Sequence, residues 1–130
     1  ALVSALSLGH EAGHWHSSEP HLGEGLSATV MRLLAGMGQP LSHVVAGLNG
    51  ERMYAREWGV TMLRNHESFA EPVRLEHPAE FTGDLGAALA PFMVAMTSLQ
   101  LAEGRARGPT LVWAASDHAE RGALVLHAAR

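Results

Sequence analysis

Cysteine is missing from the 130-residue sequence, so the chain can form neither a disulfide, nor a thiolate zinc site, nor a cysteine nucleophile. Positive charge is scarce as well. Lysine and arginine together number 9 against 13 aspartates and glutamates, the formal net charge is −4, and no basic run occurs. Such a balance argues against a surface that binds nucleic acid. We therefore expect no nucleic-acid partner.

A leader peptide and a membrane-spanning run are not evident either. The first residues, Ala1–Val3, are apolar but lack the basic segment and the long hydrophobic stretch of a signal peptide. A composition with 47% hydrophobic and 17% charged residues is typical of a globular protein. We expect one domain over residues 1–130, in the cytoplasm and without a membrane partner. The start at alanine in place of methionine suggests an excised or partial chain.

The stretch Thr82–Gly104 carries the main structural signal of the sequence. Between Gly86 and Leu101 the only polar interruptions are Thr97, Ser98 and Gln100. The stretch predicts a helix over residues 86–101 that is apolar on nearly every side, and such a helix must be buried all round. Because it is too short to span a bilayer, we expect it in the interior of a protein.

Capping residues bound this central helix at both ends. Thr82 or Asp84 can be the N-cap, because a side-chain oxygen there can accept hydrogen bonds from the free N–H groups of the first turn. Pro91 is tolerated only if it lies close to that first turn. Gly104 is a plausible C′ residue, since glycine readily adopts the positive φ of that position. We expect Asp84 to be structural first.

The remainder of the chain alternates short apolar runs with one-sided helical patterns. Gly9–Gly25, rich in glycine and histidine, has no sustained period and predicts a long irregular segment. The resulting β-α-β-α-β-α-β-β order is typical of an α/β fold with a mainly parallel sheet, whose last strand should be antiparallel. The expected strands are 1–8, 41–48, 73–77, 110–115 and 123–128, and the expected helices are 26–37, 51–65 and 86–101.

The three expected helices differ in how much of their surface is apolar. Those at 26–37 and 51–65 are apolar on one side, whereas the third is apolar all round. One sheet with solvent beyond its helices cannot explain that third helix. A second layer must cover it.

A literal HExxH motif runs from His10 through Glu11 to His14. On a helix it would place two imidazoles on one face for zinc, with the glutamate beside the zinc-bound water, as in a metalloprotease. Glycine and proline around the motif disfavour that helix. We therefore expect His10 and His14 on a loop or strand end and no metal, with a zinc-dependent hydrolase as one alternative function. Its third ligand would be His16, His21 or Glu24.

Two further sites are weak candidates for chemistry. Asn49-Gly50 at a strand end is typical of a turn, because both residues tolerate positive φ. Ser116-Asp117-His118 contains the residue types of a catalytic triad, but adjacent residues on a turn rarely converge in the required geometry. Asn49 and His118 are therefore secondary candidates.

Four segments together resemble the carboxyl-terminal half of thiolase-fold condensing enzymes, the β-ketoacyl-acyl-carrier-protein synthase family. They are GEGLSATVMRLLAGMG as the first helix, VVAGLNGE as the following strand end, TGDLGAALAPFMVAM as the central helix and TLVWAASDHAERGALVLHA as the closing strand pair. The resemblance covers nearly the whole chain and implies one thiolase-like half-domain over residues 1–130. In that family a helix of each half packs between two sheets, which would cover the apolar helix.

The family reaction is a decarboxylating Claisen condensation, in which a cysteine holds the acyl group and two residues, His-His or His-Asn, assist. The resemblance puts the cysteine in the other half and the two assisting positions at Gly47 and Asp84. Gly47 has no side chain, and an ionised Asp84 only accepts hydrogen bonds where the family uses a donor. The glycine-rich loop that the family has between its last strands is replaced by Ser116–Gly122.

The resemblance therefore implies a divergent or catalytically incomplete half of a 3-oxoacyl-acyl-carrier-protein synthase-like protein of fatty-acid or polyketide metabolism. Its expected role is to complete the fold, the dimer or the acyl pocket, without a cofactor. The implied partners are an amino-terminal thiolase half or a sister chain, in a homo- or heterodimer, and an acyl carrier protein. A non-catalytic dimer or scaffold subunit is the remaining alternative.

Overall fold

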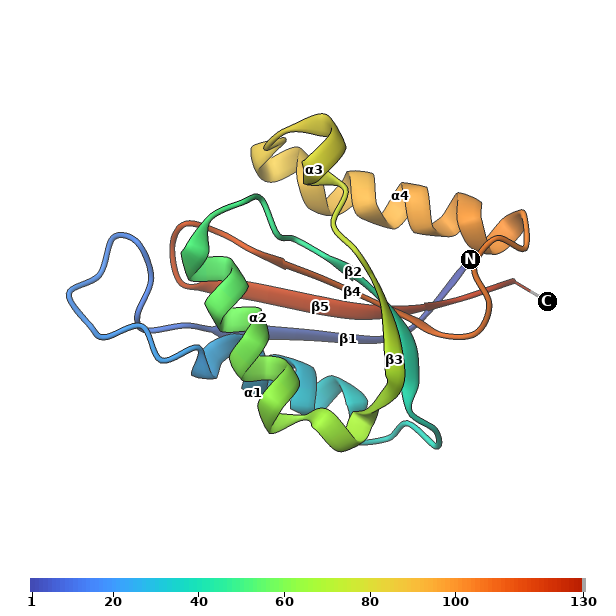
Figure 1. Cartoon of the computed structure of the whole chain (residues 1–130), viewed down its shortest axis with the longest axis horizontal. Coiled ribbons are helices and arrows are strands. Elements are labelled where there is room, and N and C mark those ends of the chain that lie inside the picture. Colours follow the sequence, from blue (N-terminus) through green and yellow to red (C-terminus); the bar gives the residue numbers. More distant parts are fainter. Residues whose placement is uncertain (130) are drawn as a thin grey trace.

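A computed structural model describes residues 1–129, which form one five-stranded sheet with helices on both faces (Figure 1). The order of the strands across the sheet is β1-β5-β4-β2-β3. The strands are β1 (Leu2–His10), β2 (Leu41–Ala46), β3 (Phe69–Glu76), β4 (Thr110–Ala115) and β5 (Glu120–His127). The helices are α1 (Glu24–Leu34), α2 (Arg52–Arg64), α3 (Ala79–Thr82) and α4 (Leu89–Ala102), with 3-10 turns at His66–Ser68 and Gly86–Ala88.

The sheet is mixed, and β5 is the strand that runs against the others. β2 pairs in parallel with both β3 and β4, whereas β5 is antiparallel to its neighbours β1 and β4. The connections between parallel strands pass through helices, as the alternation of elements requires. The predicted α/β order and the antiparallel last strand are both confirmed.

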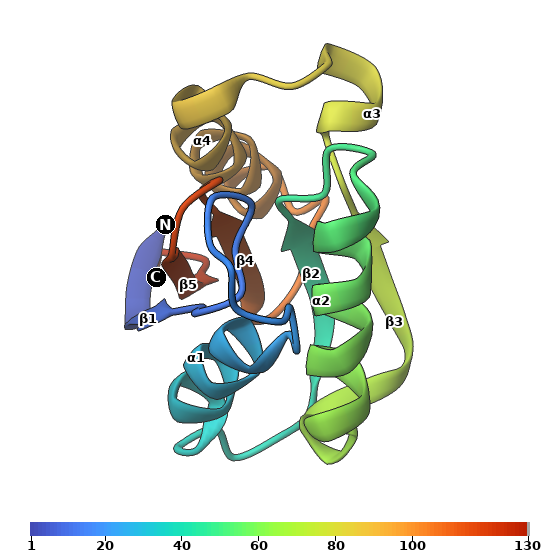
Figure 2. The same cartoon turned by 90° about the vertical axis from the view of Figure 1, so that its left-hand side faces the viewer.

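Two hydrophobic cores lie on opposite faces of the sheet, with α1 and α2 over one face and α4 over the other (Figure 2). Successive residues of β2 contribute alternately to them, because side chains of a strand point to opposite faces. Val44 and Ala46 belong to the core under α1 and α2, whereas Val45 packs with Met93 of α4. β2 is thus buried on both faces, as its apolar run predicts.

Only β4 among the strands has its predicted bounds; β2 ends at Ala46 rather than at residue 48, and β5 begins at Glu120 rather than at residue 123. β1 continues to His10, because it pairs with β5 as far as His10 opposite Glu120. β3 begins at Phe69 rather than at residue 73, and Pro72 lies inside it. Proline is tolerated there because β3 is an edge strand. On its open side no neighbouring strand would accept a hydrogen bond from the N–H that proline lacks.

α4 begins later than the central helix predicted from residue 86. Gly86–Ala88 form a 3-10 turn, and the α-helix starts at Leu89, which puts Pro91 in its first turn. At the other end Gly104 has φ 73°, and the N–H of Arg105 donates to the carbonyl of Gln100. The predicted places of Pro91 near the start and of Gly104 after the end are confirmed.

The prediction that this helix is buried all round is wrong within this chain, since the sheet covers only one side of it. Met93 and Thr97 face the sheet at 0% exposure, whereas Leu99 is 59% exposed. β1 is also uncovered on the face of the sheet that α4 covers. Leu6 of β1 pairs with Leu124, which packs in the α4 core, yet Leu6 itself is 65% exposed. Within residues 1–129 no second layer covers these apolar residues.

Candidate functional site

A cavity of about 410 Å³ lies at the carboxyl ends of β2 and β4, beside the start of α4. Small residues of the strand ends form its base, and the turn before α4 forms one side. Polar side chains from the β2–α2 connection, α2 and the β4–β5 turn form the rest. Of the four residues that the sequence marks for catalysis, three line this cavity, namely Gly47, Asn49 and Asp84.

Gly47 directly follows β2, where a side chain would pack tightly against β4. A Cβ atom there would lie 3.0 Å from the carbonyl oxygen of Trp113 and 3.1 Å from the Cα of Ala114. Both contacts are backbone atoms of the neighbouring strand β4, so they cannot rotate away. A histidine at this position would therefore require the sheet to shift, and Gly47 is a packing residue.

Asp84 bridges two loops at the mouth of the cavity. Its Oδ1 accepts the N–H of Gly86 at 2.8 Å, and its Oδ2 accepts Asn49 Nδ2 at 3.3 Å. Asn49 Oδ1 in turn accepts the N–H of Glu51. Asp84 thus caps the 3-10 turn that precedes α4, not α4 itself, which corrects the predicted N-cap. Thr82 does not cap it either, because its hydroxyl bonds to carbonyls of Pro78 and Gly83.

A tyrosine–aspartate pair closes the opposite wall. The Tyr54 hydroxyl, from the buried side of α2, bonds to the Asp117 carboxylate and lies 3.2 Å from the carbonyl oxygen of Ser116. Burial, followed by the hydrogen bond to Asp117, raises the pKa of Tyr54 well above its ordinary value of 10.0. The phenol therefore stays protonated and is committed as a donor to groups of the wall.

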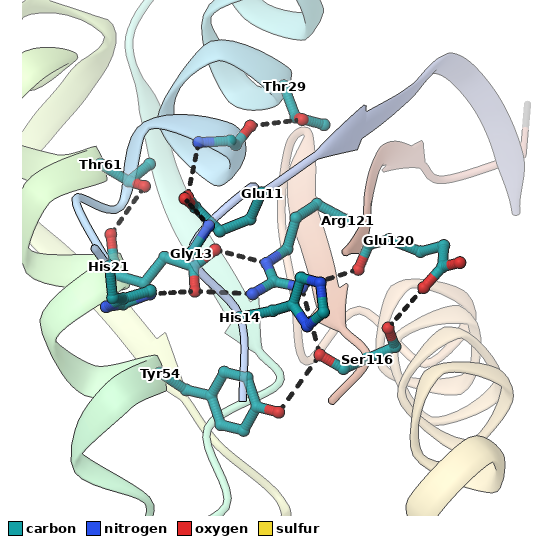
Figure 3. A network of polar contacts seen from close by, with 12 residues as sticks. Glu11, Gly13, His14, His21, Thr29, Tyr54, Thr61, Ser116, Glu120 and Arg121 are labelled. Carbon is teal, nitrogen blue, oxygen red and sulfur yellow. Dashed lines mark hydrogen bonds and ion pairs between the residues drawn. The ribbon is translucent and has the colours of Figure 1, made fainter. Parts of the chain in front are cut away.

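A buried ion pair between α2 and β5 lies behind this wall (Figure 3). Arg121 Nε and Nη2 contact the two carboxylate oxygens of Glu57 at 2.5 and 3.1 Å, and both side chains are fully buried. Arg121 Nη1 donates to the backbone carbonyls of Ser116, His118 and Glu120. The guanidinium therefore fixes the β4–β5 turn, and these contacts engage its Nε, both Nη1 N–H groups and one of the two Nη2 N–H groups.

The cavity is consequently rich in acceptors and poor in free donors. The carboxylates of Asp84, Asp117 and Glu120 line it, while the amide of Asn49 and the hydroxyl of Tyr54 already donate to two of them. A hydrogen bond from the Ser116 hydroxyl lowers the pKa of Glu120, which keeps it ionised. Three carboxylates in the lining disfavour a negative charge that develops on a substrate oxygen.

The HExxH residues do not lie on a helix. His10 ends β1, and Glu11 and His14 are in the loop that follows. The Glu11 carboxylate is buried and accepts the N–H groups of Gly25 at 2.8 Å and Gly13 at 3.2 Å. Gly25 lies in the first turn of α1, so Glu11 satisfies free donors at the positive end of that helix. The glutamate of the motif is a helix cap.

His21, one of the possible third ligands, lies next to this cap. Ligand atoms of Glu11, His21 and Glu57 come within 4.8 Å of one another, and His21 Nε2 is 3.1 Å from Glu57 Oε2. Every one of these carboxylate oxygens already accepts a hydrogen bond, and Arg121 lies against Glu57. We interpret the cluster as an ion-pair network that joins the 11–23 loop to α2.

His118 lies outside the cavity, on the exposed β4–β5 turn. Its ring stacks on that of His16, with centroids 4.6 Å apart, and the ring of His14 is 6.0 Å away. The Ser116 hydroxyl accepts the backbone N–H of His118 and does not approach its ring as in a triad. Ser116, Asp117 and His118 thus form a turn, as their adjacency predicts.

Sequence reasoning missed the Glu57–Arg121 pair. The signal was present, because Glu57 falls on the buried stripe of α2 beside Tyr54, Trp58 and Thr61. A charge on an apolar face requires a buried partner of opposite sign. The identity of that partner, 64 residues further along the chain, depends on β5 and was not readable from spacing.

The strand order and the helices on both faces of the sheet match a thiolase-like α/β fold. The chain is similar to a solved structure described as the oxazolomycin ketosynthase domain OzmH KS8 of Streptomyces albus JA3453, with a TM-score of 0.76 and 13% sequence identity. The alignment covers 98% of this chain and 44% of that chain, so this chain spans less than half of the domain it matches. No protein-family model and no curated protein sequence matches.

The structural likeness confirms the fold that the four sequence segments indicated. A sequence identity of 13% does not by itself indicate an activity. Among the described helices none is both long and apolar enough to cross a bilayer.

Proposed function

We propose that this chain is a carboxyl-terminal half of a ketosynthase-like protein, and that it supplies structure rather than catalytic groups. The main support for this proposal is the cavity at the ends of β2 and β4. Gly47 and Asp84 line it at the two assisting positions implied by the resemblance, and neither has a side-chain donor for an oxyanion. The half is catalytically incomplete.

The partner is a cysteine-bearing amino-terminal half. Support comes from the uncovered apolar side of α4 and β1, which carries no charged residue between Leu89 and Ala102 or between Leu2 and Leu8. Burial of such a face against another apolar face lowers the free energy of the assembly. In such an assembly the small residues of the cavity would form one wall of an acyl pocket, and an acyl carrier protein would be a further partner.

Co-expression tests the proposal. This chain is produced with each cysteine-bearing thiolase-type half encoded in the same genome, and association is followed by size-exclusion chromatography and decarboxylative condensation by thioester consumption. We expect a stable one-to-one complex without condensation above that of a cysteine-to-alanine control. A chain that binds none of these halves would contradict the partner.

Asp84 variants decide whether this half has lost its catalytic groups. Asp84→Ala removes the bond to the turn at Gly86 and should cost about 1 kcal/mol, whereas Asp84→Asn keeps an acceptor and should cost less. If the reconstituted complex condenses and both substitutions abolish this with an unchanged melting temperature, Asp84 is catalytic and the proposal of an incomplete half is wrong.

A further inference from the structure

A second cavity, of about 300 Å³, lies at the opposite edge of the sheet, where β2 and β4 begin. It is lined by Ser42 and His43 of β2, Arg74 of β3, and Arg105 and Arg107 of the segment between α4 and β4. The sequence has no lysine, and three of its nine arginines meet here, in a chain of net charge −4. A third of the arginines of the chain therefore line one cavity.

Two carboxylates offset part of this charge. Glu76 Oε1 lies 3.5 Å from Arg74 Nη2, and Glu103 pairs with Arg105 at 2.5 Å. Arg107 is exposed and forms no ion pair with residues 1–129. Three guanidinium groups against two carboxylates leave a net positive charge, and the uncompensated group is Arg107.

A buried polar chain positions Arg74 from behind. His43, 3% exposed, contacts Thr110 Oγ1 at 3.0 Å through Nδ1 and Glu76 Oε2 at 2.6 Å through Nε2. Glu76 Oε1 also accepts Gln100 Nε2 at 3.2 Å. His43 of β2 and Gln100 of α4 thus hold the carboxylate that faces Arg74, and Thr110 of β4 supports it through His43, so the fold itself fixes the partner of this guanidinium.

Arg74 in turn organises the segment that carries the other two arginines. Its Nη1 donates to the carbonyl oxygen of Arg105 at 3.0 Å. This bond ties the α4–β4 connection to β3 and brings Arg105 and Arg107 to the same cavity. Each guanidinium has five N–H donors, and the contacts described occupy only some of those of Arg74 and Arg105.

We propose that the cavity formed by Arg74, Arg105 and Arg107 binds a phosphate-type oxyanion, either free or as a phosphomonoester. Forked guanidinium donors match the geometry of phosphate oxygens and bind them through paired hydrogen bonds. A dianion also suits a site with more than one guanidinium better than a single carboxylate does. The site is separate from the cavity at the other edge of the sheet and does not depend on the proposed function.

Calorimetric titration of the purified chain at low ionic strength tests the site, with inorganic phosphate in one arm and glycerol 3-phosphate in the other. We expect saturable binding of at least one of them with a stoichiometry of one. Tighter binding of glycerol 3-phosphate would identify an ester as the natural form, and tighter binding of phosphate would identify the free ion. Absence of binding heat in both arms of the titration would overturn the proposal.

The variant Arg107→Gln should weaken binding about tenfold or more, because it removes the uncompensated charge. It should change the melting temperature little, since the exposed Arg107 side chain forms no ion pair with residues 1–129. Arg56→Gln, at an exposed position on α2, removes the same charge elsewhere and should leave binding unchanged. Equal losses in both variants would show diffuse attraction to a positive surface and would overturn the site.

Discussion

Gly47 is the residue at which this chain departs most clearly from a condensing half. Gly47→Ala places a methyl group against the backbone of Trp113 and Ala114 and should lower the free energy of unfolding by about 1–3 kcal/mol. Gly59→Ala, in α2 with nothing within 4 Å of the added atom, is the matched control and should raise it by about 0.5–1 kcal/mol. Urea denaturation measures both. A neutral Gly47→Ala would mean that the strand end yields easily.

Glu11 should behave as a helix cap. Glu11→Ala leaves the N–H groups of Gly25 and Gly13 without their acceptor and should cost about 1–2 kcal/mol by urea denaturation. His14→Ala is the companion variant and should have little effect on stability. Stoichiometric zinc in protein purified without added metal, lost in His14→Ala, would instead restore the zinc hydrolase as the leading function.

His43 and Glu76 make stability depend on pH in two windows. Burial lowers the pKa of His43 below its ordinary 6.5, outweighing the hydrogen bond and the charge of Glu76. Burial alone would raise the pKa of Glu76, but hydrogen bonds from His43 and Gln100 and the charge of Arg74 together hold it below 4.5. In both cases the unfolded chain binds its proton first as pH falls.

The free energy of unfolding should therefore fall as pH drops below about 6.5, from the histidine, and again below about 4.5, from the glutamate. Denaturation midpoints measured from pH 8 to pH 4 check this. In His43→Gln the loss around pH 6 should shrink, while the loss below 4.5 remains. A wild-type midpoint that rises between pH 7 and pH 5.5 would show that the sign is wrong.

At the scale of elements, α4 has one apolar side that the sheet covers and another that is exposed. Met93→Ala creates a cavity under the sheet-facing side and should cost about 2–5 kcal/mol. Leu99→Ala, on the exposed side, should cost no more than about 0.5 kcal/mol. Thermal and urea denaturation compare the two. Equal costs would indicate that another copy of the chain already covers Leu99 in solution.

The elements themselves were largely predictable, because their signals are local. Period and length gave α1, α2 and the closing strand pair, and glycine or proline marked their ends. The start of α4 was misplaced, because Gly86–Ala88 are as apolar as the helix, and only hydrogen-bond geometry separates a 3-10 turn from an α-turn. The extent of β3 was missed because its early residues depend on pairing with β2.

The candidate site was less predictable than the fold. The resemblance placed Gly47 and Asp84 in one cavity, but the wall that Tyr54, Asp117 and Arg121 build comes from contacts between residues more than 60 positions apart. No sequence period encodes such pairs. The second cavity was invisible for the same reason, since Arg74 and Arg107 meet only when β3 and the α4–β4 segment are placed in space.

At the scale of the whole molecule, a bare apolar side predicts association. Leu6 and Leu8 of β1 are 65% and 73% exposed on the side of the sheet that α4 covers only in part. The isolated chain should bind a hydrophobic dye strongly and sediment as a self-associating species or a loosely packed monomer. Analytical ultracentrifugation with dye titration measures this. A compact monomer without dye binding would contradict the half-domain.

β1 has a single neighbour in the sheet, and that neighbour is β5, with Leu2 opposite His127. β1 precedes β5 in the chain, so it leaves the ribosome first and must wait for β5 before its backbone N–H and C=O groups find partners in this sheet. Until then Leu2–His10 is an unpaired and largely apolar segment, of the kind that chaperones bind. The order of synthesis and the order of the strands thus leave β1 exposed until β5 has been made.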